Sequence, residues 1–365
     1  MYSTDQYRVF PAAPAERVLS RPRRLVTEGR SVEAEEAYRT VLATEPDLRP
    51  AWLEYFAILR AAGRHQDALA LAERAAGQFG EDALPLALRG AALVELGRFR
   101  DGLEALDAAA CLNPDLGLIW HEAGYAAWRL GELSRALMAL DRAFALEPHS
   151  GTLHLRGKVL RQAGRYLAAE VAFEGAAEAA EFPVQREAAA YEVQVTRRFA
   201  AFPGSRPDTL SPARRWFAEH GAIPLSGSAG APATPEAITQ ALGPLARELG
   251  WRFTVVVALD AWEAWYDLAR ALGVPVAAEL EAIGDDAIPL IVARHPSQLP
   301  HWEAVLARVA ESRAGAVFAL GQSPAVGLAD LIGYVGEAPA GAVDPAFALE
   351  AARHPESRLG GRRLR

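Results

Sequence analysis

Residues 97–131 read GRFRDGLEALDAAACLNPDLGLIWHEAGYAAWRLG, a stretch that begins and ends on a glycine. The same interval recurs through the first half of the chain. Spacings of 34, 34, 34 and 33 residues separate Gly29, Gly63, Gly97, Gly131 and Gly164. A fixed period of this length is typical of arrays of repeated helix pairs. The sequence therefore predicts stacked helix pairs, each with a glycine in its turn, because glycine closes a helix without steric cost.

The residues around each glycine also repeat. Five positions after it stands a small residue, which lets two helices approach closely: Ala34, Ala68, Gly102, Ala136 and Ala169. Seventeen positions after it, Pro46, Pro114 and Pro148 end the second helix, because proline has no N–H to donate. Eleven positions before it stand Trp52 and Trp120.

This frame resembles the tetratricopeptide repeat (TPR), a pair of antiparallel helices, and five copies cover roughly residues 15–182. The sequence departs from the TPR pattern at Pro22, which lies inside the first helix of the first repeat, and at Gly80, where the pattern has a proline. The amphipathic segment 183–202 suits the solvating end helix that such arrays require. We expect an N-terminal extension (1–14) and then an all-α TPR solenoid of five repeats plus an end helix (15–202).

The first helices of such an array line an inner surface that binds extended peptides, so the resemblance implies protein binding. In the second and third repeats the inward positions are apolar or small, relieved only by Arg60 and Glu95: Leu53, Ala57, Ala61, Ala87, Ala91 and Val94. In the fourth and fifth repeats they are mostly aromatic or basic, which predicts a peptide-binding groove made of His121, Tyr125, Trp128, Arg129, His154, Lys158 and Arg161. Such groups stack on a side chain and pair with a carboxylate. The alternative is that the aromatic residues pack against the next repeat and the charges are solvated.

Two narrower functions of this groove are not expected. The clamp with which chaperone-binding TPR proteins hold acidic carboxy-terminal peptides needs lysines and asparagines, and only Lys158 is present here. His121 and His154 recur at equivalent positions, but a zinc site needs a third protein ligand, and none is in sight. No metal or cofactor is predicted.

Past residue 202 the period ends and apolar runs alternate with helical segments. The runs are RFTVVVALD (252–260), AIPLIVAR (287–294) and GAVFALG (315–321), separated by AWEAWYDLARALG (261–273) and LPHWEAVLARVAES (299–312). This alternation predicts an α/β domain with a mostly parallel sheet over residues 203–345. A basic C-terminal tail (346–365) follows, which either folds back on the acidic domain or meets an acidic partner.

Ligands of parallel sheets gather at the carboxyl ends of the strands. Those ends supply a possible ligand crevice of Ser226, Ser228, Asp260, Arg294 and Gln322. Asp260 reads equally well as a helix cap. The loops contain no dinucleotide-binding glycine motif, P-loop or nucleophile elbow, so no catalytic residue is predicted. Residues 250–325 are faintly similar in layout to phosphoribosyltransferases, but the paired acids Asp285 and Asp286 precede the second apolar run, whereas those of the family follow it.

The composition narrows the class of protein. The chain has 365 residues, 51% hydrophobic and 23% charged, with a formal net charge of −8, which argues against nucleic acid as a partner. Its single cysteine, Cys111, suits a reducing compartment, and no secretory signal or long apolar span is visible. We expect a cytoplasmic, bacterial-looking adaptor that binds a protein segment. The alternative is an enzyme or small-molecule sensor whose α/β domain binds a phosphorylated ligand.

Overall fold

The structure is a computed structural model that describes residues 14–228, 230–280, 283–284, 286–323, 326–335, 339 and 341–364. The expected N-terminal extension lies outside this part of the chain, except for its last residue. The chain forms two compact units, Met1–Val159 and Leu160–Arg365. Among the described residues, no helix is long and apolar enough to cross a membrane.

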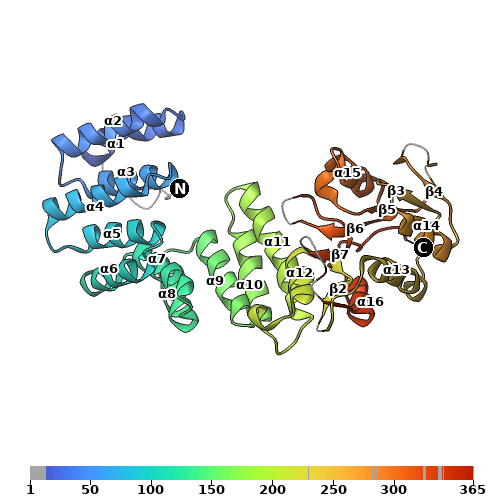
Figure 1. The fold of residues 1–365 in the computed structure, drawn as a ribbon. Helices are drawn as coiled ribbons and strands as arrows, with labels where there is room; N and C mark the ends of the chain where they lie inside the picture. The colour runs from blue at the N-terminus through green and yellow to red at the C-terminus, as the bar shows by residue number, and fades with distance from the viewer. Residues whose placement is uncertain are drawn as a thin grey trace. The chain divides into compact units, whose positions relative to one another are not determined.

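The first unit is built of consecutive helices joined by short turns (Figure 1). In chain order they are α1 (Pro14–Thr27), α2 (Ser31–Thr44), α3 (Arg49–Ala61), α4 (His65–Phe79), α5 (Ala83–Glu95), α6 (Phe99–Leu112), α7 (Gly117–Arg129), α8 (Leu133–Leu146) and α9 (Ser150–Gln162), which crosses the division between the units. Each helix from α1 to α7 packs against the next, and α5 also contacts α3 and α7. Neighbouring first helices therefore lie side by side.

The five repeat glycines occupy the turns between paired helices, as predicted. All have φ values between 70° and 80°, in the left-handed region that favours glycine. No described residue from 15 to 200 lies in a strand. The period, the turns and the helix pairs from α1 to α10 (Tyr166–Glu178) confirm the TPR-type arrangement.

Small residues at the repeated positions are required by the packing of paired helices. A Cβ on Gly90 would lie 2.6 Å from Cγ of Leu106 and 3.0 Å from the carbonyl oxygen of Gly102. A Cβ on Gly124 would lie 2.7 Å from Cγ of Leu140. Ala136 is fully buried at the same helix contact. The helices of each pair therefore approach to a distance that a larger side chain would prevent.

One expectation about the inner surface is wrong. Ala87, Ala91 and Val94 do not line an open groove, because all three are buried. They lie on α5, which packs against the first helices on both sides. Ala87 and Val94 share a core with Ile119 and Ala123 of α7. Because their side chains are small, α7 closes over this part of α5.

The second unit continues with helices and then builds a sheet. Its remaining helices are α11 (Pro183–Ala200), α12 (Pro212–His220), α13 (Pro235–Leu249), α14 (Glu263–Leu272), α15 (Trp302–Ser312) and α16 (Pro345–Arg353), with short 3-10 helices η2 (Pro207–Thr209) and η4 (Pro296–Gln298). The strands are β1 (Ile223–Pro224), β2 (Ser226–Ser228), β3 (Val255–Ala258), β4 (Val276–Ala277), β5 (Pro289–Ala293), β6 (Ala316–Gln322), β7 (Leu331–Val335) and β8 (Ala342–Val343).

Six of these strands form one parallel sheet in the order β1-β7-β6-β5-β3-β4, which confirms the predicted sheet type. A separate antiparallel pair joins β2 and β8. From β3 the chain moves outward to β4 and then returns across β3 to β5, so the direction of winding switches between β3 and β5. Ligands of parallel sheets bind at the carboxyl end of such a switch point. The loops that follow β3 and β5 begin with Leu259 and Arg294.

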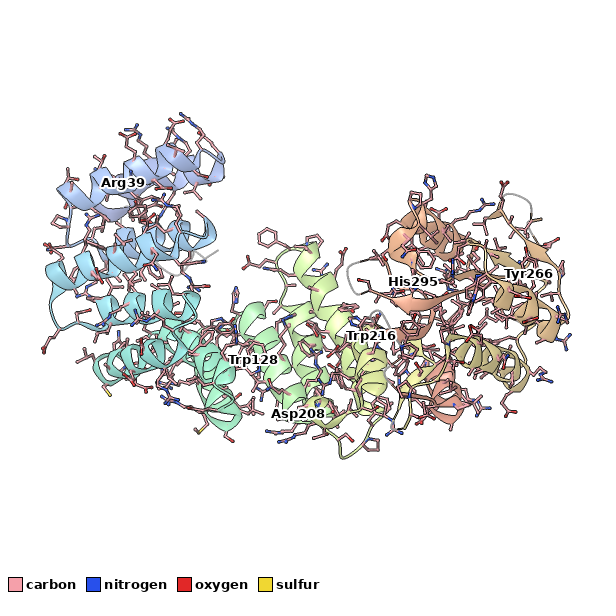
Figure 2. All side chains as sticks on the ribbon, in the orientation of Figure 1. Arg39, Trp128, Asp208, Trp216, Tyr266 and His295 are labelled. Carbon is pink, nitrogen blue, oxygen red and sulfur yellow. The ribbon has the colours of Figure 1, made fainter. Side chains whose placement is uncertain are left out.

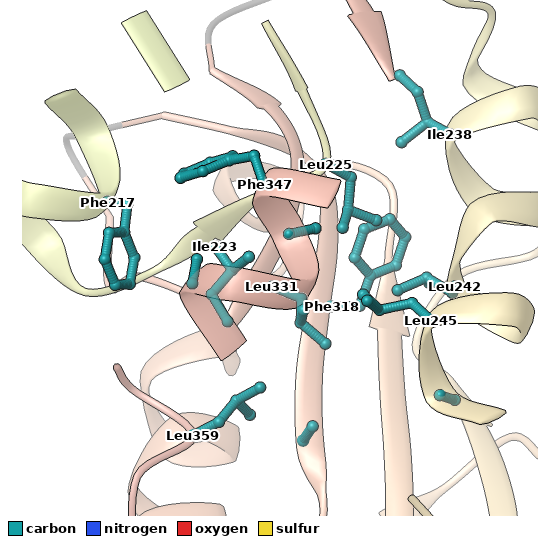
Figure 3. Packing of buried hydrophobic residues seen from close by; sticks show 14 of the residues in the cluster. Phe217, Ile223, Leu225, Ile238, Leu242, Leu245, Phe318, Leu331, Phe347 and Leu359 are labelled. Carbon is teal, nitrogen blue, oxygen red and sulfur yellow. The ribbon is translucent and has the colours of Figure 1, made fainter. Parts of the chain in front are cut away.

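Both faces of the sheet are apolar and covered. Alternate strand residues, such as Phe318 and Leu331, point toward α13, α14 and α16. Figure 3 shows this core, with Phe347 of α16 and Leu242 of α13 around the strands. The opposite face, which includes Val317, packs against α15. Residues buried on both faces explain the continuous apolar runs in the sequence.

The helices just before the sheet belong to its core. Tyr166 of α10 and Phe199 of α11 are buried in the same cluster as Phe217 of α12. Arg198 of α11 is also buried, and its guanidinium donates to the carbonyl oxygens of Ala218, Glu219 and Glu356. This shared core places the division between the units at Val159, earlier than the expected boundary near residue 203.

The predicted basic tail folds back onto the sheet, which is the first of the two alternatives given for it. Residues 345–353 form α16, and Leu359 and Leu364 are buried in the sheet core. Arg362 donates to the carboxylate of buried Asp330 at 3.2 Å and to the carbonyl oxygen of Val309. The segment folds onto the sheet because it carries apolar residues between its arginines.

Replacing Ala136 by leucine tests the close helix contact. Because the site is fully buried, the added atoms must displace neighbouring side chains, at a cost of about 1 to 3 kcal/mol in the free energy of unfolding. Urea unfolding followed by circular dichroism measures this loss. Ala145→Leu is the matched control on the exposed face of α8, where we expect a change within about 0.5 kcal/mol. Equal stabilities of the two variants would contradict the contact.

Candidate functional site

Helix α7 presents four of the seven predicted groove residues. His121, Tyr125, Trp128 and Arg129 lie three or four positions apart and therefore share one face of the helix. Tyr125 and Trp128 are partly buried, whereas Arg129 is exposed. Figure 2 labels Trp128 on this helix. The repeat packing described above fixes the position of α7.

Three of these side chains form a compact cluster with Phe99 of α6. The guanidinium of Arg129 lies 4.4 Å from the ring centroid of Phe99 and donates to the hydroxyl of Tyr125 at 2.8 Å. The Tyr125 ring lies 5.8 Å from Trp128 and 6.3 Å from Phe99, centroid to centroid. We call Phe99, Tyr125, Trp128 and Arg129 the α7 cluster. Phe99 is not among the groove residues predicted from the sequence, although it stands two positions after the turn glycine and opens α6.

His121 is held within the repeats. Its Nδ1 lies 3.0 Å from the hydroxyl of Thr152, at the start of α9. Burial, and then the charges of His149 and Arg60, lower the pKa of His121 to about 4. The imidazole is therefore neutral near pH 7. Among the described residues, no group of three potential metal ligands occurs, here or elsewhere.

A second polar network near this site was not predicted. The carboxylate of Glu122 on α7 is buried and accepts from Arg60 of α3 at 2.8 Å. Arg60 also donates to Glu95 of α5 at 2.5 Å. Burial raises the pKa of Glu122, and Arg60 opposes that rise. Arg60 reaches from the second repeat to the fourth because the intervening side chains on α5 are small, which no spacing rule in the sequence reveals.

The groove residues from the fifth repeat are divided between the two units. His154 and Lys158 lie on the part of α9 that belongs to the first unit, and both are partly buried. Arg161 belongs to the second unit. There its guanidinium pairs with Glu192 at 2.5 Å and lies over the rings of Phe173 and Phe199. Arg161 is therefore engaged within its own unit.

At the carboxyl edge of the sheet, the structure brings together two of the predicted crevice residues. The carboxylate of Asp260 accepts from the backbone N–H of Arg294 at 2.7 Å and from Nε1 of Trp265 at 2.8 Å. Nε of Arg294 lies 3.5 Å from the same carboxylate. Asp260 is not the cap of α14, because Trp262 occupies that position. Asp260 instead joins the loops that follow β3 and β5.

The other crevice residues hold loops. The buried side chain of Gln322 accepts from the backbone N–H of Ala329 at 3.1 Å and donates to the carbonyl oxygen of Ser323 at 2.9 Å. Ser226 is also buried and donates to the carbonyl oxygen of Gly333 at 2.7 Å. Ser228 ends β2, and its side chain lies outside the described part of the chain.

One group at this edge has an ion-pair partner but no hydrogen bond among the described residues. Nε of Arg294 is buried and makes no hydrogen bond among the described residues, while the rest of the side chain is partly exposed. His295, labelled in Figure 2, follows it and lies against Gly321, where a Cβ would be 2.9 Å from its Nδ1. The described residues of this edge thus offer a cation at the switch point.

Comparison with solved structures finds TPR proteins over about half of the chain. A thermophilic TPR protein of Thermus thermophilus shares 20% identity with a TM-score of 0.43, over 49% of this chain and 98% of that one. A MamA protein shares 19% with a TM-score of 0.34, over 45% and 90%. YrrB, a TPR protein with an unusual peptide-binding site, shares 16% with a TM-score of 0.34, over 49% and 99%.

At these identities and scores the likenesses carry no argument about function. No protein-family model and no curated protein sequence matches the chain. The phosphoribosyltransferase resemblance of residues 250–325 is supported by none of these comparisons.

The low pKa of His121 predicts how stability changes with pH. The unfolded chain takes up a proton near pH 6.5, whereas the folded site does so only near pH 4, so the free energy of unfolding falls as the pH drops between these values. The loss is up to about 3 kcal/mol. His121→Gln, which keeps a polar partner for Thr152, should remove this part of the dependence. Denaturation at a series of pH values across this range measures the change in stability, and NMR titration of the His121 ring measures its pKa. Titration of the ring near pH 6.5 would contradict the lowered pKa.

Proposed function

We propose that this chain is a protein-interaction scaffold whose helical repeats bind an extended segment of a partner protein at the α7 cluster. The observation that carries the proposal is the preformed geometry of Arg129. Its guanidinium lies over the Phe99 ring and is fixed by the Tyr125 hydroxyl, yet the residue is exposed. A cation already held in place loses little side-chain entropy when it binds.

The chemistry of the cluster indicates what kind of segment it suits. An arginine guanidinium forms charge-assisted bonds with a carboxylate, often two at once. The neighbouring indole of Trp128 offers an aromatic face for an apolar or aromatic side chain. We therefore propose a partner segment that carries a carboxylate beside an apolar residue. His154 and Lys158 extend the same surface in this proposal, whereas Arg161 does not.

The sheet unit has an accessory, non-catalytic role in this proposal. Asp260, Gln322 and Ser226 each use their polar atoms to hold a loop or strand. A nucleophile activated by a neighbouring base is not found among the described residues of the carboxyl edge. We place the protein in the cytoplasm, which its one cysteine, the free and exposed Cys111, suits.

Substitutions in the α7 cluster test the scaffold proposal. The full chain is used to capture partners from its native cell, and the captured protein is then titrated against purified variants. We expect Trp128→Ala to weaken binding at least about tenfold, because buried aromatic anchors dominate such interfaces. Arg129→Lys keeps the charge but loses the planar stacking, so it should bind less well than the wild type and better than Arg129→Ala.

The control is Arg100→Ala, which removes an exposed arginine from α6 outside the cluster. It should bind like the wild type. The three arginine variants should unfold at similar urea concentrations, since exposed charges contribute little to stability. Trp128→Ala should unfold at a lower urea concentration, because it removes a partly buried ring that packs against the repeat core. Undiminished binding by Trp128→Ala and Arg129→Ala would place the partner elsewhere.

The buried Nε of Arg294 lies 3.5 Å from the Asp260 carboxylate but makes no hydrogen bond among the described residues, which favours a second candidate function, a sensor of a small anionic ligand at the sheet switch point. Inorganic phosphate is the probe. If the site binds anions, phosphate should raise the melting temperature of the wild type, and Arg294→Ala should lose most of this rise. Arg270→Ala, on the exposed face of α14, is the control. An equal rise in all three proteins would exclude a specific site.

A further inference from the structure

Exposed arginines gather at the amino edge of the sheet, opposite the predicted crevice. Arg252 precedes β3, Arg313 follows α15, and Arg363 lies near the end of the chain. Backbone bonds bring them together. The N–H of Arg252 donates to the carbonyl oxygen of Leu364, and the N–H of Arg363 donates to that of Arg313, both at 2.7 Å. We call these three residues the arginine edge.

The arginine edge differs from the arginines beside it. Arg362 is bound to buried Asp330, and Arg353 lies 3.8 Å from Glu248. Arg252, Arg313 and Arg363, by contrast, form no ion pair with any residue that the structure describes. The positive charges of these three residues repel one another, and no ion pair among the described residues offsets that repulsion. The folded chain therefore holds an uncompensated positive surface here, although its formal net charge is −8.

A cavity with apolar walls opens beside these charges. It has a volume of about 260 Å³ and is lined by Trp251, Ala352, Leu359, Arg362, Arg363 and Leu364. A second hollow of about 460 Å³ adjoins Arg252 and includes Arg247 and Glu248. Apolar side chains thus form part of the wall of the first cavity, together with Arg362 and Arg363, and Arg252 lines the second hollow. This arrangement suits an apolar side chain that is flanked by carboxylates.

The backbone at Arg313 gives an independent observation. Helices α12, α13 and α14 end on the left-handed glycines Gly221, Gly250 and Gly273, but α15 ends on Arg313 with φ = 52°. Among the described residues it is the only non-glycine with a positive φ. A side chain in this conformation is less favourable than glycine, which has no Cβ to clash with the backbone. The arginine is present at the position where glycine would be more stable.

We propose that the arginine edge binds an acidic segment of a partner protein, with one apolar side chain of that segment seated in the cavity beside Trp251. A protein segment fits better than nucleic acid or an anionic membrane. The surface is small. At salt concentrations that screen charges beyond about 10 Å, an extended polyanion gains little binding energy from a chain that is acidic overall. The proposal does not depend on the α7 cluster, because the two surfaces belong to different units.

The test uses a short fluorescein-labelled peptide of aspartate and glutamate with one central leucine. The full chain carries Trp128→Ala and Arg129→Ala, so that the α7 cluster cannot account for binding. Fluorescence anisotropy should show binding that weakens with added salt. The same peptide with asparagine and glutamine in place of the acids should bind at least about tenfold more weakly.

Variants of the arginine edge then locate the site. Arg252→Glu with Arg363→Glu should weaken binding at least about tenfold, whereas Arg186→Glu, a charge reversal on the exposed face of α11, should not. Arg313→Gly is the most informative variant. It removes a charge and relieves the backbone, so it should weaken peptide binding while leaving the melting temperature unchanged or higher.

Four results would overturn the proposal. The first is equal binding of the acidic and neutral peptides. The second is equal loss of binding in Arg186→Glu and in the double charge reversal. The third is tighter binding of single-stranded DNA or of phosphatidylserine vesicles than of the acidic peptide. If the parent with an intact α7 cluster binds the peptide and the substituted chain does not, the peptide sits at the α7 cluster and the arginine edge is not its site.

Discussion

Paired helices in the first unit approach so closely at Gly90 and Gly124 that no β-carbon fits between them. This contact sets the distance between the two helices of each repeat and, through α5, the distance between neighbouring first helices. Two consequences follow for the surface. Arg60 can reach past α5 to the buried carboxylate of Glu122. The start of α6 also lies near enough to α7 for Phe99 to support Arg129.

The sheet unit uses buried polar groups for a similar purpose. Asp260 fixes the loops at the switch point, Gln322 fixes the loop after β6, and Asp330 anchors the last residues of the chain through Arg362. A buried polar group is costly unless it is hydrogen-bonded, so each of these side chains restricts the loops around it. Polar residues at the carboxyl edge are therefore weak evidence for a ligand. The buried Nε of Arg294 is the stronger sign there, because it lies beside Asp260 but makes no hydrogen bond among the described residues.

The two proposed binding surfaces rely on the same kind of group in different settings. In the α7 cluster, Arg129 is fixed by an aromatic ring and a hydroxyl. At the arginine edge three arginines are exposed, Arg363 lines a partly apolar cavity, and Arg313 has a backbone conformation that glycine adopts more readily. Arginine suits both settings, because its planar group stacks on rings and forms paired bonds with carboxylates.

The sequence by itself determined the features that depend on local spacing. The period fixed the helix pairs and their turn glycines, and the apolar runs indicated most strands of the parallel sheet. The short β7 and the helices α12 and α16 were not anticipated, since their patterns are brief. Only the tertiary structure decided which charges are paired. Arg161 meets Glu192, whereas Arg252, Arg313 and Arg363 come together through backbone bonds with no counter-charge among the described residues. Such pairings join residues far apart in the chain, and their distances follow from packing, which no local pattern encodes.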